Sequence, residues 1–300
     1  MMSIKTDVSK SAGSLQTCAG QEAGIEATIH AVRELFENDS NEGMIIIDAS
    51  NAFNSVNREA FLHNIKIICP PLSLFTFNCC ATKARLFVIC GLEILSSEGT
   101  TQGDPIAMVV YGIAIIPMIM MMVEMNDESD DITRIAGYAD DISATGKLKQ
   151  LRRWLDKISK LGPKFGYYPQ NDKSWLIVKP ELYEEAKKIF SGTKINITTE
   201  GRKYLGGVIG TDKFKTEYVD EKIEEMIKQL ERFCKIAMYE PQAAYSAFIF
   251  GFKHKITYLM RCIPNISCQL EVLDEIILTK FIPTTISNGV LCSLIDDSEN

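Results

Sequence analysis

The sequence predicts an α+β fold, in which an antiparallel sheet backed by helices precedes a helical C-terminal region. Residues 43–47 form a short apolar run typical of a buried strand, and residues 132–146 hold two β-compatible runs around a turn. Beyond Asp212 the apolar residues recur at helical spacing instead. With 300 residues, 46% of them hydrophobic and 24% charged, the chain has the composition of one large or two smaller globular domains.

The N-terminal third is predicted to contain two helices and a hairpin around the first strand. Residues 1–14 are polar and are expected to fray. Residues 21–37 carry apolar side chains at helical spacing, which predicts an amphipathic helix. A second helix is expected to open at 57–62 and to end at Pro70–Pro71, because proline breaks the hydrogen-bond ladder. Residues 86–95 predict a hairpin with Gly91 in its bend.

Residues 105–123 are 19 residues without a charge, which meets the length criterion for a membrane span. Gly112 and Pro117 count against a simple lipid-facing helix, and no cluster of basic residues marks a cytoplasmic flank. A helix that is apolar on all sides can also lie in the core of a large protein. We therefore expect a core helix, with membrane anchoring as the competing hypothesis.

The C-terminal half alternates short strands with helices and then becomes helical. Residues 147–160 predict a helix with an apolar inner face and a strongly basic outer one, which faces either solvent or phosphates. Strands are predicted at 175–178 and, as a glycine-rich pair, at 203–210. Three helical segments follow, at residues 218–238, 242–262 and 269–281.

Three carboxylates stand at the ends of predicted strands. Asp48 follows the apolar run, and Asp140–Asp141 lie at the turn of the predicted hairpin. An Asp–Asp pair by itself is typical of a surface turn. If the two strands pair, however, the three carboxylates converge, and a divalent cation is needed to offset their repulsion. Oxygen ligands at a shallow site favour Mg²⁺, and two such ions clamp the oxygens of a phosphoryl transfer, so the predicted chemistry is nucleotidyl transfer.

Five short motifs, in family order between residues 48 and 206, resemble those of reverse transcriptases, especially the enzymes of retrotransposons and group II introns. They are Asp48-Ala49-Ser50-Asn51-Ala52-Phe53, Thr101-Gln102-Gly103-Asp104-Pro105, Tyr138-Ala139-Asp140-Asp141, Gly166-Tyr167-Tyr168-Pro169-Gln170-Asn171-Asp172-Lys173 and Tyr204-Leu205-Gly206. Residues 16–21 also resemble the segment just upstream in retroelement enzymes. The likeness covers roughly the first two-thirds of the chain.

The resemblance implies a fold and domains. It implies a polymerase palm, a ferredoxin-like antiparallel sheet backed by helices, at residues 43–210. An N-terminal remnant of the fingers would occupy residues 1–42, and a helical thumb or connection region residues 211–300. Most of the fingers are expected to be lacking, because only 47 residues precede Asp48. Asn51 and Asn54 depart from the common form of the first motif, where a lysine and an aspartate are frequent.

The resemblance also implies roles for single residues. Asp48, Asp140 and Asp141 would be catalytic and hold two Mg²⁺ ions, with Mn²⁺ as a possible substitute. Lys173 would act on the triphosphate, and the ring of Phe53 would block a 2′-hydroxyl and so favour dNTPs. Gln102, Gly103 and Tyr138 would contact nucleotide or template, and Leu205 and Gly206 would form the primer grip.

Two functions remain open at this point. The first is an RNA-directed DNA polymerase acting on an RNA or DNA template-primer. The second is a catalytically defunct module that binds nucleic acid or, through its C-terminal helices, protein. The net charge of −7 and the pI of about 5.2 argue against nucleic-acid binding, since polymerases carry basic surfaces for phosphates. Nine cysteines without a C-x-x-C pair predict reduced thiols in a cytoplasmic or nuclear, non-secreted protein.

Overall fold

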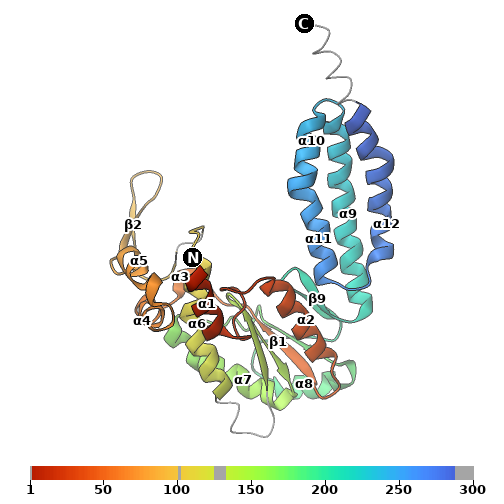
Figure 1. Ribbon diagram of the computed structural model, residues 1–300. Helices are drawn as coiled ribbons and strands as arrows, with labels where there is room; N and C mark the ends of the chain where they lie inside the picture. Colours follow the sequence, from red (N-terminus) through yellow and green to blue (C-terminus); the bar gives the residue numbers. More distant parts are fainter. Residues whose placement is uncertain (1, 101–102, 125–132, 288–300) are drawn as a thin grey trace. The chain divides into compact units, whose positions relative to one another are not determined.

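The computed structural model describes residues 2–100, 103–124 and 133–287, and the chain divides into two compact units, Met1–Thr199 and Glu200–Asn300 (Figure 1). The glycine-rich strand pair after residue 200 therefore belongs with the C-terminal helices and not with the main sheet. The names fingers, palm and thumb stay predictions for these segments.

The first unit contains the five-stranded sheet and most of the helices. Its helices are α1 (Met2–Ala12), α2 (Gly24–Glu37), α3 (Ala52–Ser55), α4 (Arg58–Ile68), α5 (Pro70–Cys80), α6 (Ala107–Glu124), α7 (Leu148–Leu161) and α8 (Tyr183–Ile189), with 3₁₀ turns at Gly162–Phe165 and Pro180–Leu182. Its strands are β1 (Gly43–Ile47), β2 (Ala84–Phe87), β3 (Glu93–Ser96), β4 (Arg134–Tyr138), β5 (Asp141–Gly146), β6 (Trp175–Val178) and β7 (Asn196–Thr198).

The main sheet has the order β4-β5-β1-β6-β7. The first three pairings are antiparallel, as the sequence predicts, whereas β7 joins β6 in parallel. A parallel neighbour needs a crossover connection, and α8 supplies it. The predicted α+β class is therefore confirmed, with a sheet that is mixed at one edge.

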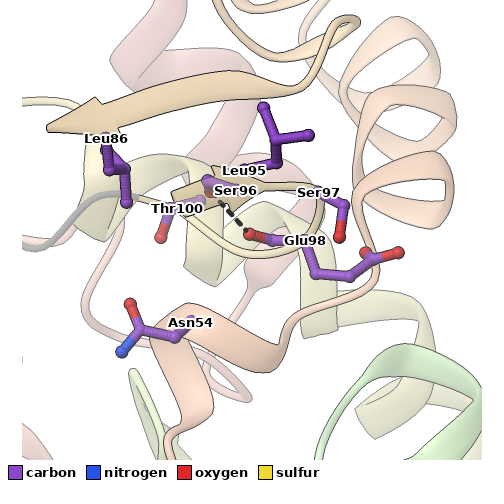
Figure 2. Close-up of a pocket in the computed structure, with 7 residues that line it drawn as sticks. All are labelled: Asn54, Leu86, Leu95, Ser96, Ser97, Glu98 and Thr100. Atoms are coloured by element: carbon purple, nitrogen blue, oxygen red, sulfur yellow. Dashed lines mark hydrogen bonds between the residues drawn. The ribbon is translucent and has the colours of Figure 1, made fainter. Parts of the chain in front are cut away.

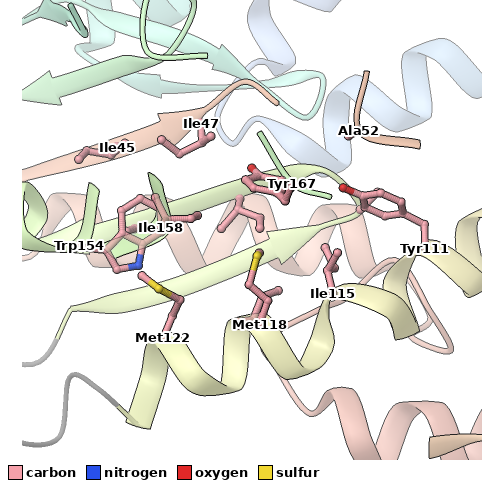
Figure 3. Packing of buried hydrophobic residues seen from close by; sticks show 14 of the residues in the cluster. Ile45, Ile47, Ala52, Tyr111, Ile115, Met118, Met122, Trp154, Ile158 and Tyr167 are labelled. Carbon is pink, nitrogen blue, oxygen red and sulfur yellow. The ribbon is translucent and has the colours of Figure 1, made fainter. Parts of the chain in front are cut away.

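The core of the first unit lies between this sheet and helices α6 and α7. Ile45 and Ile47 on β1 are fully buried. Tyr111, Ile115, Met118 and Met122 follow one another along α6 at helical spacing and point toward the sheet, next to Trp154 and Ile158 of α7 (Figure 3). By length and composition α6 could cross a membrane, but 61% of it is buried inside the unit, as in a core helix.

The N-terminal segment differs from the prediction. Residues 1–14 were expected to fray, whereas α1 is a helix that packs against α4 and α6. Val8 and Ala12 are each only 1% exposed. The prediction was wrong because most residues of the segment are polar. Val8 and Ala12 are four residues apart and therefore lie on one face of the helix, which is buried.

The second unit is a hairpin followed by a helical bundle. It contains β8 (Gly201–Tyr204), β9 (Gly207–Gly210), α9 (Asp212–Ala237), α10 (Pro241–Ala247), α11 (Lys253–Cys262) and α12 (Ser267–Ile276), with π-helical turns at Phe248–Phe252 and Ile277–Phe281. Aromatic rings fill the bundle: Phe252 lies 5.6 Å from Phe233, and Phe248 lies 4.8 Å from Phe281, measured between ring centroids. The predicted helical region is thus confirmed.

Candidate active site at one end of the sheet

Strand register brings the three predicted carboxylates to one end of the main sheet. Ile47 of β1 pairs with Ile142 of β5, so continuing the register by one residue sets Asp48 opposite Asp141. Tyr138 pairs with Asp141 across the hairpin, which leaves Ala139 and Asp140 as its two-residue turn. Asp48 is exposed, and Asp140 and Asp141 are half-buried. Residues more than 90 positions apart in the sequence thus share one sheet end.

The carboxylates of this cluster act on one another. Burial raises the pKa of Asp141 from 3.8 to about 6, and the negative charges of Asp140 and Asp48 add to the rise. Burial also raises the pKa of Asp140, with a further contribution from Asp48. No ion pair joins Asp140 or Asp141 to a basic side chain in the described part of the chain. The turn therefore carries negative charge that the described residues leave unneutralised.

This donor set suits a divalent cation in its chemistry. Carboxylate oxygens are the ligands that Mg²⁺ prefers, and charges of one sign at half-buried positions are offset by a bound cation. As the side chains stand, no three His, Cys, Asp or Glu residues among those described form a group that holds a metal ion.

The loop that carries Lys173 is fixed to the backbone of Asp48. The Asp48 amide donates to the hydroxyl of Ser174 over 3.1 Å, and the amide of Gln170 donates to the Asp48 carbonyl over 2.8 Å. Residues 170–174 form a turn just before β6, and Ala49 bridges Pro169 on the other side of this turn. Asp48 thus has a carboxylate opposite it on β5, and on its other side the turn that contains the exposed Lys173. The sequence did not identify Ser174, which is fully buried.

Phe53 rests on an aromatic residue that the sequence did not single out. Its ring stacks on Tyr111 with 4.4 Å between centroids and 23° between planes. Tyr111 is 1% exposed, and its hydroxyl has no hydrogen-bond partner among the described residues. A second buried tyrosine, Tyr167, donates its hydroxyl to the carbonyl of Asp140 over 3.0 Å. Figure 3 shows Tyr111 and Tyr167 beneath the end of the sheet.

The loop before α6 is shaped by Arg58. Its guanidinium donates to the carbonyls of Ser96, Glu98 and Gly99 over 2.9–3.3 Å, and its backbone amide donates to the Glu98 carboxylate over 2.8 Å. An open cavity of about 550 Å³ borders this loop, with walls from α3 and the β2–β3 hairpin (Figure 2). Gly103 is exposed with φ of +93°, whereas Gln102 lies outside the described residues.

Replacing Arg58 with lysine tests the role of this guanidinium. Lysine keeps the charge but cannot reproduce the planar fork, so several carbonyls lose their donor. We expect the free energy of unfolding to fall by about 1–2 kcal/mol in chemical denaturation. Arg85→Lys is the matched control: Arg85 is exposed and pairs only loosely with Glu93, at 3.8 Å. Equal stability of the two variants would contradict the assignment.

The remaining predicted site residues fall into two groups. Tyr138 is half-buried on β4, beside the carboxylates. Leu205 and Gly206 belong to the second unit, where they form the turn between β8 and β9 with φ of +51° and +79°. The hydroxyl of Tyr258 donates to the Leu205 carbonyl over 2.6 Å, and a Cβ on Gly206 would lie 2.9 Å from the Tyr258 ring. Close packing in a left-handed turn therefore requires glycine at position 206.

This chain is similar to solved structures, but no family model and no curated protein matches its sequence. Among solved structures, apo telomerase from Candida tropicalis is similar with a TM-score of 0.50 and 12% identity, over 70% of this chain and 38% of that one. Telomerase from Candida albicans, solved in complex with a TWJ fragment of telomeric RNA, gives a TM-score of 0.46 at 9% identity, over 96% of this chain and 52% of that one.

Apo telomerase from Candida tropicalis shows which fold this chain has. This chain spans less than two-thirds of either telomerase chain. At 12% identity the likeness concerns the fold alone, and it does not single out retrotransposon or group II intron enzymes. The α+β unit with its carboxylates at one sheet end, followed by a helical unit, is thus similar in fold to part of this telomerase chain.

Proposed function

We propose that this chain is the RNA-directed DNA polymerase (reverse transcriptase) domain of a retroelement. The observation that carries the proposal is the meeting of Asp48, Asp140 and Asp141 at one end of a sheet in a polymerase-like fold. The five motifs, in family order, add the retroelement assignment. The substrates would be dNTPs and an RNA or DNA template-primer, in the cytoplasm or nucleus.

Each residue of the site has a task in this proposal. Asp48, Asp140 and Asp141 would hold two Mg²⁺ ions, which when bound would lower the pKa of the primer 3′-hydroxyl and neutralise the triphosphate. The ammonium group of Lys173, in the turn that is hydrogen-bonded to the backbone of Asp48, would stabilise the pyrophosphate as it leaves or give it a proton. The buried hydroxyl of Tyr167 would hold the backbone of Asp140 in place.

Phe53→Ala is expected to reduce discrimination against ribonucleotides about tenfold or more. The ring stacked on Tyr111 would fill the space beneath the sugar, and removing it leaves room for a 2′-hydroxyl. The measurement is the ratio of kcat/KM for dNTP and rNTP incorporation. Phe77→Ala is the control, since Phe77 is 56% exposed on α5. An unchanged ratio in Phe53→Ala would remove Phe53 from the nucleotide site.

Primer extension tests the function directly. The chain is incubated with dNTPs and a DNA primer on RNA and on DNA templates, with Mg²⁺ or Mn²⁺. We expect Mg²⁺-dependent extension on the RNA template. If the chain shows no extension under saturating template and dNTPs, with either metal, the polymerase proposal fails for this chain.

A defunct binding module is the second candidate. Its support is the arrangement of the carboxylates, which form no ready metal group among the described residues. The net charge of −7 favours the form of this candidate that binds protein over the form that binds nucleic acid. Salt-dependent binding to a primer-template without extension would favour it. A protein partner would bind through the C-terminal helices, where Tyr239 and Phe250 are 80% and 81% exposed.

A further inference from the structure

The hairpin turn that carries Asp140 has an unfavourable backbone conformation. Ala139, the first residue of the turn, has φ of +53°. Positive φ is uncommon for a residue with a Cβ, and such a residue persists only where its surroundings hold it. The peptide groups on either side of Ala139 lead directly into Asp140 and Asp141. Whatever holds Ala139 therefore also sets the direction of the two carboxylates.

The side chain of Gln16 holds both peptide groups of Ala139. The amide of Ala139 donates to Gln16 Oε1 over 2.8 Å, and Gln16 Nε2 donates to the carbonyl of Ala139 over 3.1 Å. Gln16 is 0% exposed, so water does not compete for either bond. A primary amide is the neutral group that offers a donor and an acceptor side by side. The side-chain oxygen and nitrogen of Gln16 thus bond the amide and the carbonyl of the same residue, Ala139.

The backbone around Gln16 fixes its position relative to the hairpin. The amide of Gly137 donates to the Leu15 carbonyl and the amide of Thr17 donates to the Gly137 carbonyl, each over 2.9 Å. A Cβ on Gly137 would lie 2.9 Å from the Leu15 carbonyl oxygen, so glycine permits this approach. The Thr17 hydroxyl also bonds that of Thr28 on α2 over 2.6 Å. Residues 15–17 therefore form a fixed support along the edge of β4.

We propose that Gln16 is a positioning residue of the candidate metal site, and that it holds the Ala139 turn so that Asp140 and Asp141 can share a divalent cation. The inference rests on the proposed function where it invokes the cation. It goes beyond that function because it assigns the geometry of the carboxylates to a side chain far upstream, with no carboxylate of its own. Gln16 would touch neither the ion nor the substrate.

Gln16→Met in the full chain tests the proposal, because methionine is similar in length but supplies no comparable pair of hydrogen bonds. The first readout is hydrogen exchange of the Ala139 amide, which we expect to become about 100-fold faster. The second is the Kd for Mn²⁺, followed by calorimetry, which we expect to rise about tenfold. Gln21→Met is the matched control: Gln21 is exposed and, in the described part of the chain, its side chain bonds the Gly13 carbonyl alone. It should change neither value.

A rescue variant separates turn geometry from general loss of stability. Glycine adopts positive φ without the Cβ penalty, so Ala139→Gly should restore about threefold or more of the Mn²⁺ affinity lost in Gln16→Met. Lack of recovery would overturn the assignment to turn geometry. If Gln16→Met by itself does not fold, the Mn²⁺ affinity of the double variant is compared with that of Ala139→Gly.

The outcomes distinguish this inference from the proposed function. Tight Mn²⁺ binding by the wild type and by a folded Gln16→Met variant would overturn the role of Gln16 and leave the proposed function standing. A wild type that binds no Mn²⁺ would overturn the proposed metal site and this inference with it. Slow exchange of the Ala139 amide in Gln16→Met would show that Gln16 does not hold the turn, and would overturn the inference by itself.

Discussion

Asp140→Asn is expected to abolish Mg²⁺-dependent primer extension on an RNA template, with a loss of about 1,000-fold or more, equivalent to about 4 kcal/mol of transition-state stabilisation. Asp140 lies in the two-residue turn of the β4–β5 hairpin, beside Asp141 and near Asp48. Asparagine keeps the size and one oxygen but removes the charge that a divalent cation requires. The measurement is the single-turnover rate at saturating primer-template and dNTP.

Asp156→Asn is the control for this prediction. Asp156 lies on α7 and forms an i,i+4 ion pair with Arg152 at 3.2 Å, on the helix surface. Loss of this ion pair should change the extension rate less than about twofold, because exposed ion pairs contribute little to stability. Extension by Asp140→Asn at the rate of an active wild type would remove Asp140 from the catalytic set.

Asp141→Asn is expected to stabilise the metal-free protein at neutral pH, by up to about 3 kcal/mol. The pKa of Asp141 is raised from 3.8 to about 6, by burial first and then by Asp140 and Asp48. Because the folded state holds this proton more tightly than the unfolded state, the contribution of Asp141 to stability is fully present below about pH 4 and is lost as the pH rises through about 6. Asparagine resembles the protonated form and avoids that loss.

The measurement is chemical denaturation in EDTA, at about pH 7.5 and about pH 4.5, for wild type, Asp141→Asn and Asp156→Asn. The advantage of Asp141→Asn should be large at the higher pH and small at the lower one. Added Mg²⁺ should reduce it, because the ion binds the folded wild type and stabilises it by mass action. A variant less stable than wild type in EDTA at neutral pH would contradict the electrostatic reading of the cluster.

Much of the fold was predictable because the signals are local. The apolar run before Asp48 gave β1, and the runs around Ala139 gave the β4–β5 hairpin. The uncharged stretch that forms α6 met the length criterion for a membrane span, although Gly112 and Pro117 already favoured a core helix. Its packing against the sheet and α7 agrees with the core helix. The helix at residues 2–12 was missed because its two buried positions are marked by contacts with α4 and α6 and not by composition.

The site was predictable in part. Asp48, Asp140 and Asp141 could be found because they are charges at the ends of apolar runs, where charge is costly without a partner. Nothing in the local sequence singles out Ser174, Tyr111 or Arg58. Their roles become visible only from their contacts with Asp48, Phe53 and the Ser96 carbonyl. Gln16 is the extreme case: its partner Ala139 lies 123 positions along the chain.

By itself the sequence determined several of the strands and helices, among them β1 and the β4–β5 hairpin, and which acidic residues stand at their ends, because periodicity and side-chain chemistry act over a few neighbouring residues. The tertiary structure alone decided that β5 and β6 flank β1, so that Asp48 lies opposite Asp141, and that Gln16 reaches the turn. Strand order and register result from the packing of distant segments against one another, and no local pattern specifies them.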